Sequence, residues 1–162
     1  MSALAVPQAV MLLPGDVVLG ERGDRLETLL GSCVSIILTD PRRTVGVMSH
    51  IVVPGTSGRC ALRDDTRGAQ ALQTMTALLH SRGIVPGLCE AYVFGGGNMF
   101  PQLTEGPQIG DDNVDWALHT LAALGVRVIG SDLGGTVCRR LRWTVGPEAP
   151  QMRAIPIQAS PS

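Results

Sequence analysis

Cys33 and His50 are the two residues whose types and placement suit catalysis. Cys33 lies in the run Thr28-Leu29-Leu30-Gly31-Ser32-Cys33-Val34, and His50 ends the next apolar segment, Val47-Met48-Ser49-His50. A free thiol has a pKa of about 8.5, and a neighbouring imidazolium lowers that pKa and increases the fraction of nucleophilic thiolate. The pair therefore predicts a cysteine hydrolase in which His50 activates the thiol and carries its proton.

Gly31 and Ser32, immediately before the cysteine, favour the same chemistry. A residue without a Cβ atom lets backbone N–H groups approach a developing oxyanion closely. Gly31-Ser32-Cys33 thus predicts a nucleophile together with oxyanion or substrate-binding donors. Taken alone, a cysteine in an apolar strand is more often a small core residue, so the prediction requires that Cys33 and His50 meet in space.

The segments around the two residues have the composition of neighbouring strands. Residues 33–39 and 44–53 are β-branched and apolar, and Asp40-Pro41-Arg42-Arg43 between them is typical of a turn. A hairpin of these strands would return His50 towards Cys33.

The other predicted elements define the fold class. Helical spacing and end signals predict two helices, and composition predicts five more strands, the last two as a closing hairpin. The helices are 66–82 and 112–124, and the strands are 16–20, 91–94, 126–129, 139–145 and 152–157. This order has no βαβ repeat, so it favours an α+β fold, a mixed β-sheet sandwich flanked by helices.

Size and charge narrow the classes of function. A chain of 162 residues and 17.0 kDa with 44% hydrophobic residues predicts one domain, 1–162, with 158–162 as a loose tail. The net charge of −1 argues against nucleic acid or an anionic membrane surface as the main partner. Residues 1–13 have no basic residue and are interrupted by Pro7, which predicts neither a signal peptide nor a membrane span.

The cysteines and arginines add two expectations. Cys33, Cys60, Cys89 and Cys138 are widely separated without a C-x-x-C pair, which predicts reduced thiols in a cytoplasm and neither disulfides nor zinc. All thirteen basic residues are arginine, whose planar fork suits carboxylate-rich partners, although a GC-rich genome gives the same bias.

Two further patterns have structural explanations. Gly95-Gly96-Gly97-Asn98 matches no phosphate-binding pattern, so it predicts a tight turn or a close approach of backbones. Asp111, Asp112 and Asp115 stand at a predicted helix start, where acidic residues compensate the helix dipole. No metal or other cofactor is therefore predicted.

Several ordered blocks resemble one family, the chemoreceptor glutamine deamidases (CheD). They are Leu-Gly-Ser-Cys-Val at 30–34, Met-Ser-His at 48–50, Val-Phe-Gly-Gly-Gly-Asn-Met-Phe at 93–100, and Asp-Leu-Gly-Gly at 132–135. The resemblance implies hydrolysis of receptor glutamines to glutamates by a protein-glutamine glutaminase, and a fold similar to bacterial deamidating toxins. It implies Cys33, His50 and a threonine as catalytic residues. Thr28 is the candidate threonine, and the adjacent Glu27 is the alternative that could orient His50.

The resemblance also implies partners. Methyl-accepting chemotaxis receptors would be the substrate, and some family members bind a CheC-type phosphatase. Two alternatives stay open: a regulatory module that binds receptors or the phosphatase with little or no catalysis, and a receptor methylesterase using the same cysteine.

Overall fold

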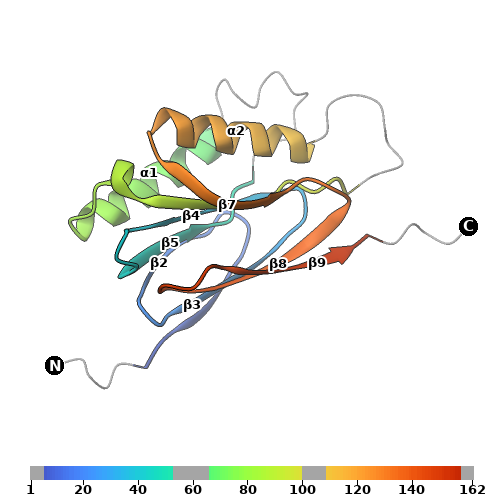
Figure 1. The fold of residues 1–162 in the computed structure, drawn as a ribbon. Helices are drawn as coiled ribbons and strands as arrows, with labels where there is room; N and C mark the ends of the chain where they lie inside the picture. The colour runs from blue at the N-terminus through green and yellow to red at the C-terminus, as the bar shows by residue number, and fades with distance from the viewer. Residues whose placement is uncertain (1–5, 53–65, 100–108, 158–162) are drawn as a thin grey trace, which may run out of the picture.

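The computed structural model describes residues 6–52, 66–99 and 109–157 (Figure 1). Val53, Cys60 and the predicted tail 158–162 lie outside these residues. Within them the chain forms nine strands, two α-helices and one 3₁₀ helix. They are β1 (Ala9–Leu12), β2 (Val17–Glu21), β3 (Arg25–Leu30), β4 (Val34–Thr39), β5 (Val45–Ser49), α1 (Thr66–Ser81), η1 (Pro86–Leu88), β6 (Glu90–Gly95), α2 (Ile109–Ala123), β7 (Arg127–Leu133), β8 (Val137–Thr144) and β9 (Gln151–Pro156).

The strands form two mixed sheets packed face to face. Sheet A has the order β1-β3-β8-β9, and sheet B has the order β2-β5-β4-β6-β7. Each contains one parallel pair, β1 with β3 and β6 with β7. Figure 1 shows both helices on the face of sheet B that points away from sheet A. The α+β sandwich of mixed sheets predicted from the sequence is therefore confirmed.

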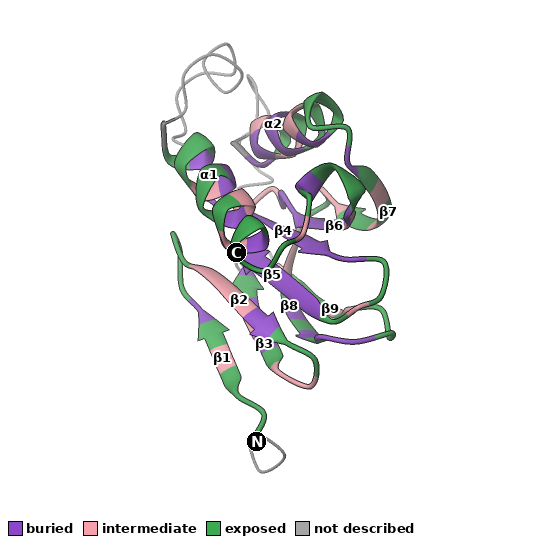
Figure 2. Cartoon of the chain, turned by 90° about the vertical axis from the view of Figure 1, so that its left-hand side faces the viewer, coloured by how far each residue is buried: buried purple, intermediate pink, exposed green. Residues whose placement is uncertain are grey.

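Two hydrophobic cores follow from this layering. One lies between the helices and sheet B and includes Ile36, Leu38, Met75 and Leu121. The other lies between the sheets. Because sheet B is covered on both faces, every residue of β4 and β5 is buried, and Figure 2 shows these strands in the interior.

Two glycine residues allow close contacts between the layers of the fold. A Cβ atom on Gly46 of β5 would overlap the indole ring of Trp143 in β8, so glycine lets the two sheets approach there. A Cβ atom on Gly68 of α1 would likewise meet the indole of Trp116 in α2. These contacts fix the distance between the sheets and between the helices.

Most predicted elements occur, with differences at the ends. Helix α2 begins at Ile109 instead of Asp112, and β7 continues to Leu133 along β6 beyond the predicted end at Ile129. Strands β1 and β3 were not predicted. β1 is short and flanked by prolines, and β3 carries charged and apolar residues without clean alternation. Both belong to sheet A, which supplies part of the site.

Candidate active site

The antiparallel hairpin of β4 and β5 brings Cys33 and His50 together. Its register pairs Ile37 with Met48, and an isolated bridge pairs Val34 with Ile51 in the same register. Ser35 then lies opposite His50, and Cys33 is the diagonal neighbour of His50 on the same face. Diagonal neighbours lie about 7–8 Å apart, within reach of an imidazole ring.

No hydrogen bond joins these two described side chains in the free protein. Cys33 packs against the core between the sheets and is half-buried, while His50 is 4% exposed. Catalytic hydrogen bonds in free enzymes are commonly long and tighten when substrate binds. The geometry therefore allows the predicted pair, although the two side chains are not in hydrogen-bond contact here.

Thr28 contacts His50 from the opposite sheet. Thr28 is fully buried in β3, and its Oγ1 lies 2.7 Å from His50 Nδ1 and 2.9 Å from the carbonyl oxygen of Leu12. A hydroxyl has one proton, which Thr28 donates to Leu12, so Oγ1 accepts the proton of His50 Nδ1. The neutral imidazole thus carries its proton on Nδ1, and Nε2 has the free lone pair of a base.

Glu27 lies on the other face of β3. Its carboxylate pairs with Arg142 at 3.0 Å and with Arg25 at 3.4 Å, both of which are exposed. Adjacent residues of a strand point to opposite faces, so Glu27 cannot contact His50 while Thr28 does. Of the two candidates for orienting the imidazole, the structure brings only Thr28 to it.

The turn before β2 holds the histidine backbone. The N–H of Gly15 donates to the carbonyl oxygen of His50 at 2.8 Å, and the N–H of His50 donates to that of Asp16 at 2.9 Å. Burial lowers the pKa of His50 below its usual value, and the nearby carboxylate of Asp16 opposes that decrease. Asp16 was missed by sequence reasoning because the contact joins distant parts of the chain.

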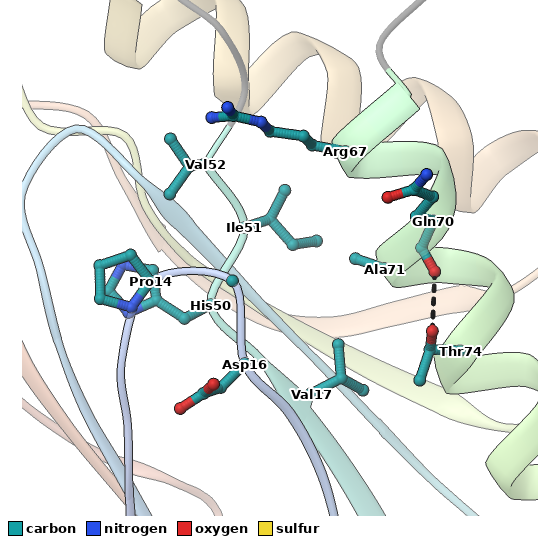
Figure 3. A pocket seen from close by; sticks show the side chains of 11 residues that line it. Pro14, Asp16, Val17, His50, Ile51, Val52, Arg67, Gln70, Ala71 and Thr74 are labelled. Atoms are coloured by element: carbon teal, nitrogen blue, oxygen red, sulfur yellow. Dashed lines mark hydrogen bonds between the residues drawn. The ribbon is translucent and has the colours of Figure 1, made fainter.

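A cavity of about 720 Å³ adjoins His50. Figure 3 shows it between the start of β2, the residues after β5, and the α1 side chains Gln70, Ala71 and Thr74. Asp16 and His50 contribute to its wall, whereas Cys33 does not.

The loop carrying Cys33 is fixed through its carbonyl groups. The carbonyl oxygens of Gly31 and Cys33 accept hydrogen bonds from the N–H groups of Gly97 and Gly96, at 3.0 and 2.9 Å. The side-chain amide of Asn113 in α2 donates to the carbonyl oxygen of Ser32 at 2.6 Å. Among the described residues, the N–H groups of Ser32 and Cys33 donate to no backbone carbonyl outside the helices and strands.

The glycine run makes the close backbone approach that the sequence predicted, and its partner is the Cys33 loop. Gly95 has φ +117°, and a Cβ atom there would overlap the carbonyl oxygen of Cys33. At Gly31, the missing Cβ makes room for the sulfur of Met99, which is a packing reason for the glycine. Arg139, almost fully buried, holds the same region by donating to the carbonyl oxygens of Gly95 and Gly134 and pairing with Asp132.

The thiol is not acidified in the free protein, contrary to the sequence expectation. Burial raises the pKa of Cys33, and its own backbone N–H only partly opposes this effect. With the pKa of His50 lowered, a neutral thiol beside a neutral imidazole is the favoured state at neutral pH.

Two buried polar atoms complete the surroundings. Within the described residues, Ser35 Oγ and Asn113 Oδ1 have no hydrogen-bond partner. The described segments hold no group of three His, Cys, Asp or Glu side chains placed to bind a metal ion. They also contain no helix long and apolar enough to cross a membrane.

The fold and these side chains define an α+β protein with a cysteine, a histidine and a threonine gathered where two sheets meet. Residues 58–148 match the family model described as CheD chemotactic sensory transduction. The chain is also 36% identical over 149 residues to a probable chemoreceptor glutamine deamidase CheD 2 of Albidiferax ferrireducens, covering 90% of this chain and 86% of the relative. The chain belongs to the CheD family.

Other similarities differ in strength. A probable chemoreceptor glutamine deamidase CheD of Pseudomonas savastanoi is 34% identical over 135 residues, covering 82% of this chain and 76% of the relative. Among solved structures, the Neisseria meningitidis protein NMB0706, of family DUF152, matches with a TM-score of 0.49 and 14% identity. That match covers 81% of this chain and 65% of the other.

Proposed function

We propose that this protein is a chemoreceptor glutamine deamidase, with Cys33 as nucleophile, His50 as general base and acid, and Thr28 as the residue that orients the imidazole. The observation that carries the proposal is the buried chain of hydrogen bonds from His50 Nδ1 through Thr28 to the Leu12 carbonyl. It leaves Nε2 as the base on the strand beside Cys33. Family relatives named as probable chemoreceptor glutamine deamidases support the substrate.

The first half of the reaction forms a thioester. His50 Nε2 takes the proton of Cys33 while the sulfur attacks the carboxamide carbon of glutamine. The carbonyl oxygen becomes an oxyanion, for which the N–H groups of Ser32 and Cys33 are the proposed donors. The carbon–nitrogen bond then breaks, and His50 returns the proton so that ammonia leaves.

The second half releases glutamate. His50 removes a proton from water, the resulting hydroxide attacks the thioester, and the carbon–sulfur bond breaks. The sulfur regains the proton from His50, so the sum is glutamine plus water to glutamate plus ammonia. No cofactor enters either half.

The partners follow from the substrate. Chemotaxis receptors are the proposed protein substrate, which places the reaction in the cytoplasm where receptor signalling regions lie. A CheC-type phosphatase is a further proposed partner, supported by the family resemblance, and a direct binding measurement with that protein tests it.

The deciding experiment is mass spectrometry of a receptor cytoplasmic domain after incubation with this protein. We expect glutamines to gain the mass that marks replacement of an amide by an acid. Cys33→Ala should abolish the change, whereas Cys89→Ala, which removes a buried thiol at the other end of β4, should retain it. Equal deamidation by Cys33→Ala would refute the proposed nucleophile.

A further inference from the structure

The outer face of sheet A is uncovered and rich in arginine. The sheet packs one face on sheet B, and both helices lie beyond sheet B, so nothing described covers the other face (Figure 1). Arg140 and Arg142 of β8 and Arg153 of β9 are exposed there. They border a hollow of about 240 Å³. Leu29 and Ile155, 51% and 41% exposed, lie beside them.

The arrangement of charge on this face is unfavourable for the isolated protein. Arg140 is directly opposite Arg153 in the β8–β9 register. Like charges directly opposite each other destabilise a sheet. Among the described residues, no salt bridge joins either arginine to a carboxylate; Glu27, on the same face, pairs with Arg25 and Arg142. An anionic ligand would relieve this repulsion.

The excess of positive charge is confined to the outer face of sheet A. Among the described residues, Arg25, Arg140, Arg142 and Arg153 on this face stand against the carboxylate of Glu27, and against two carboxylates when Glu148 of the adjoining turn is counted. The whole chain has a net charge of −1, so the positive face contrasts with the rest of the surface. Arginine forks bind carboxylates through paired hydrogen bonds, which suits this face to an acidic partner.

The face also lies close to the candidate nucleophile. Leu29 is opposite Arg140 in the β3–β8 register, and β3 leads directly into the loop that carries Cys33. Four residues of chain span at most about 14 Å. A protein whose glutamine reaches Cys33 can therefore extend over this face.

We propose that the Arg140–Arg153 face docks a carboxylate-bearing, partly apolar surface of the same protein whose glutamine is presented to Cys33. This inference rests on the proposed function and adds a second contact area outside the site. The exposed Leu29 and Ile155 favour a protein over a nucleic acid, because the phosphate backbone offers them no apolar partner. Charges of this kind chiefly raise the association rate and its dependence on salt.

The test compares Arg140→Gln/Arg153→Gln with Arg82→Gln/Arg127→Gln. Each pair removes two exposed arginines, and the control pair lies away from sheet A, where Arg82 and Arg127 pair with Glu21 and Glu90. Binding to a receptor cytoplasmic domain is measured in a Cys33→Ala background at several salt concentrations. Deamidation kinetics of the same domain and iodoacetamide alkylation of Cys33 are measured in the otherwise wild-type protein.

The face variant should lose about tenfold in kcat/KM, the low end of electrostatically steered rate gains, with kcat unchanged. Its receptor binding should weaken and become less dependent on salt, while alkylation of Cys33 and the control pair stay as in wild type. Wild-type binding and salt dependence in the face variant would overturn the proposal. The proposal would also be overturned if the face variant kept wild-type receptor binding but lost binding to anionic vesicles or to DNA. That result would assign the face to those ligands.

Failure of the proposed function gives a different result. A wild-type protein that deamidates no receptor glutamine refutes the activity, while the binding measurement in the Cys33→Ala background still tests the face. Receptor binding that is sensitive to Arg140 and Arg153 would then support docking without catalysis.

Discussion

Replacing Thr28 by valine isolates the hydrogen bond that orients His50. Valine keeps the branched shape but removes the hydroxyl, so the buried Leu12 carbonyl and the Nδ1–H of His50 lose their partner. Leaving such a buried group unpaired costs about 1–3 kcal/mol, which should appear as a lower free energy of unfolding.

The catalytic cost is estimated separately from the stability. His50 becomes positively charged when it takes the thiol proton, and a hydrogen bond to a charged group contributes about 1.5–3 kcal/mol. At 1.36 kcal/mol for each factor of ten, Thr28→Val should lower kcat by about 10- to 150-fold. Thr28→Ser, which keeps the hydroxyl, should recover much of this loss.

Thr39→Val is the matched control. Thr39 is equally buried, and its Oγ1 donates to the Val45 carbonyl at 2.8 Å at the far end of β4. Both variants should lose stability in chemical denaturation, Thr28→Val somewhat more because it leaves two groups unpaired, but only Thr28→Val should lose kcat in an ammonia-release assay. In Thr28→Val, nitrogen NMR of His50 should also show a mixture of the two neutral tautomers, with the proton on Nδ1 in some molecules and on Nε2 in others. Wild-type kcat in Thr28→Val would refute the orienting role.

Three further predictions concern the groups around the pair. His50 is a base only when neutral, so activity appears as pH rises through the pKa of His50. The carboxylate of Asp16 raises this pKa. Asp16→Asn should therefore move the acid limb of the kcat/KM profile to lower pH. Because burial raises the pKa of Cys33, its alkylation by iodoacetamide should titrate above the value of about 8.5 found in the denatured chain. Gly95→Ala should disrupt the Cys33 loop and slow turnover, whereas Gly125→Ala, with φ +72° and no atom within 4 Å of the added Cβ, should cost only backbone strain. An acid limb that does not move in Asp16→Asn would contradict the role of Asp16. A Cys33 pKa at or below that of the denatured chain would contradict the effect of burial. Equal turnover in Gly95→Ala and Gly125→Ala would contradict the role of Gly95.

The hairpin that carries Cys33 and His50 could be predicted because its signals are local. Two β-branched, apolar segments enclose an Asp-Pro turn, and the structure pairs them in antiparallel fashion. The side of each residue follows from alternation along a strand. The proximity of Cys33 and His50 could thus be predicted from a short stretch of sequence.

The relation between Thr28 and His50 could not be predicted so directly, because it joins two sheets. In β3, the exposed Leu29 breaks the alternation that would mark the inward face. Leu26 and Leu30 are buried on the same side of β3 as Thr28, because residues two apart in a strand share a face. The even-numbered leucines were therefore the sequence signal that Thr28 points inward. The same alternation excludes Glu27, which lies on the other face of β3.

The pKa values of the pair depend on burial, which no local pattern gives. An imidazole near a thiol predicts a lowered thiol pKa, but both groups lose hydration in the fold and the effect reverses. Asp16 affects His50 through a turn that is distant in sequence. The sequence pointed to Cys33 and His50 as a candidate pair, whereas the directions of their pKa shifts required the structure.

The site depends on the packing of the two sheets. His50 belongs to the β5 side of sheet B, Thr28 belongs to sheet A, and Cys33 lies on the segment that connects them. The contact of Gly46 with Trp143 sets the sheets close together four residues before His50. A movement of one sheet by the length of a hydrogen bond would separate Thr28 from His50 while leaving each hairpin intact. The orientation of the proposed base is therefore a property of the sandwich core, and core variants should impair catalysis before they unfold the protein.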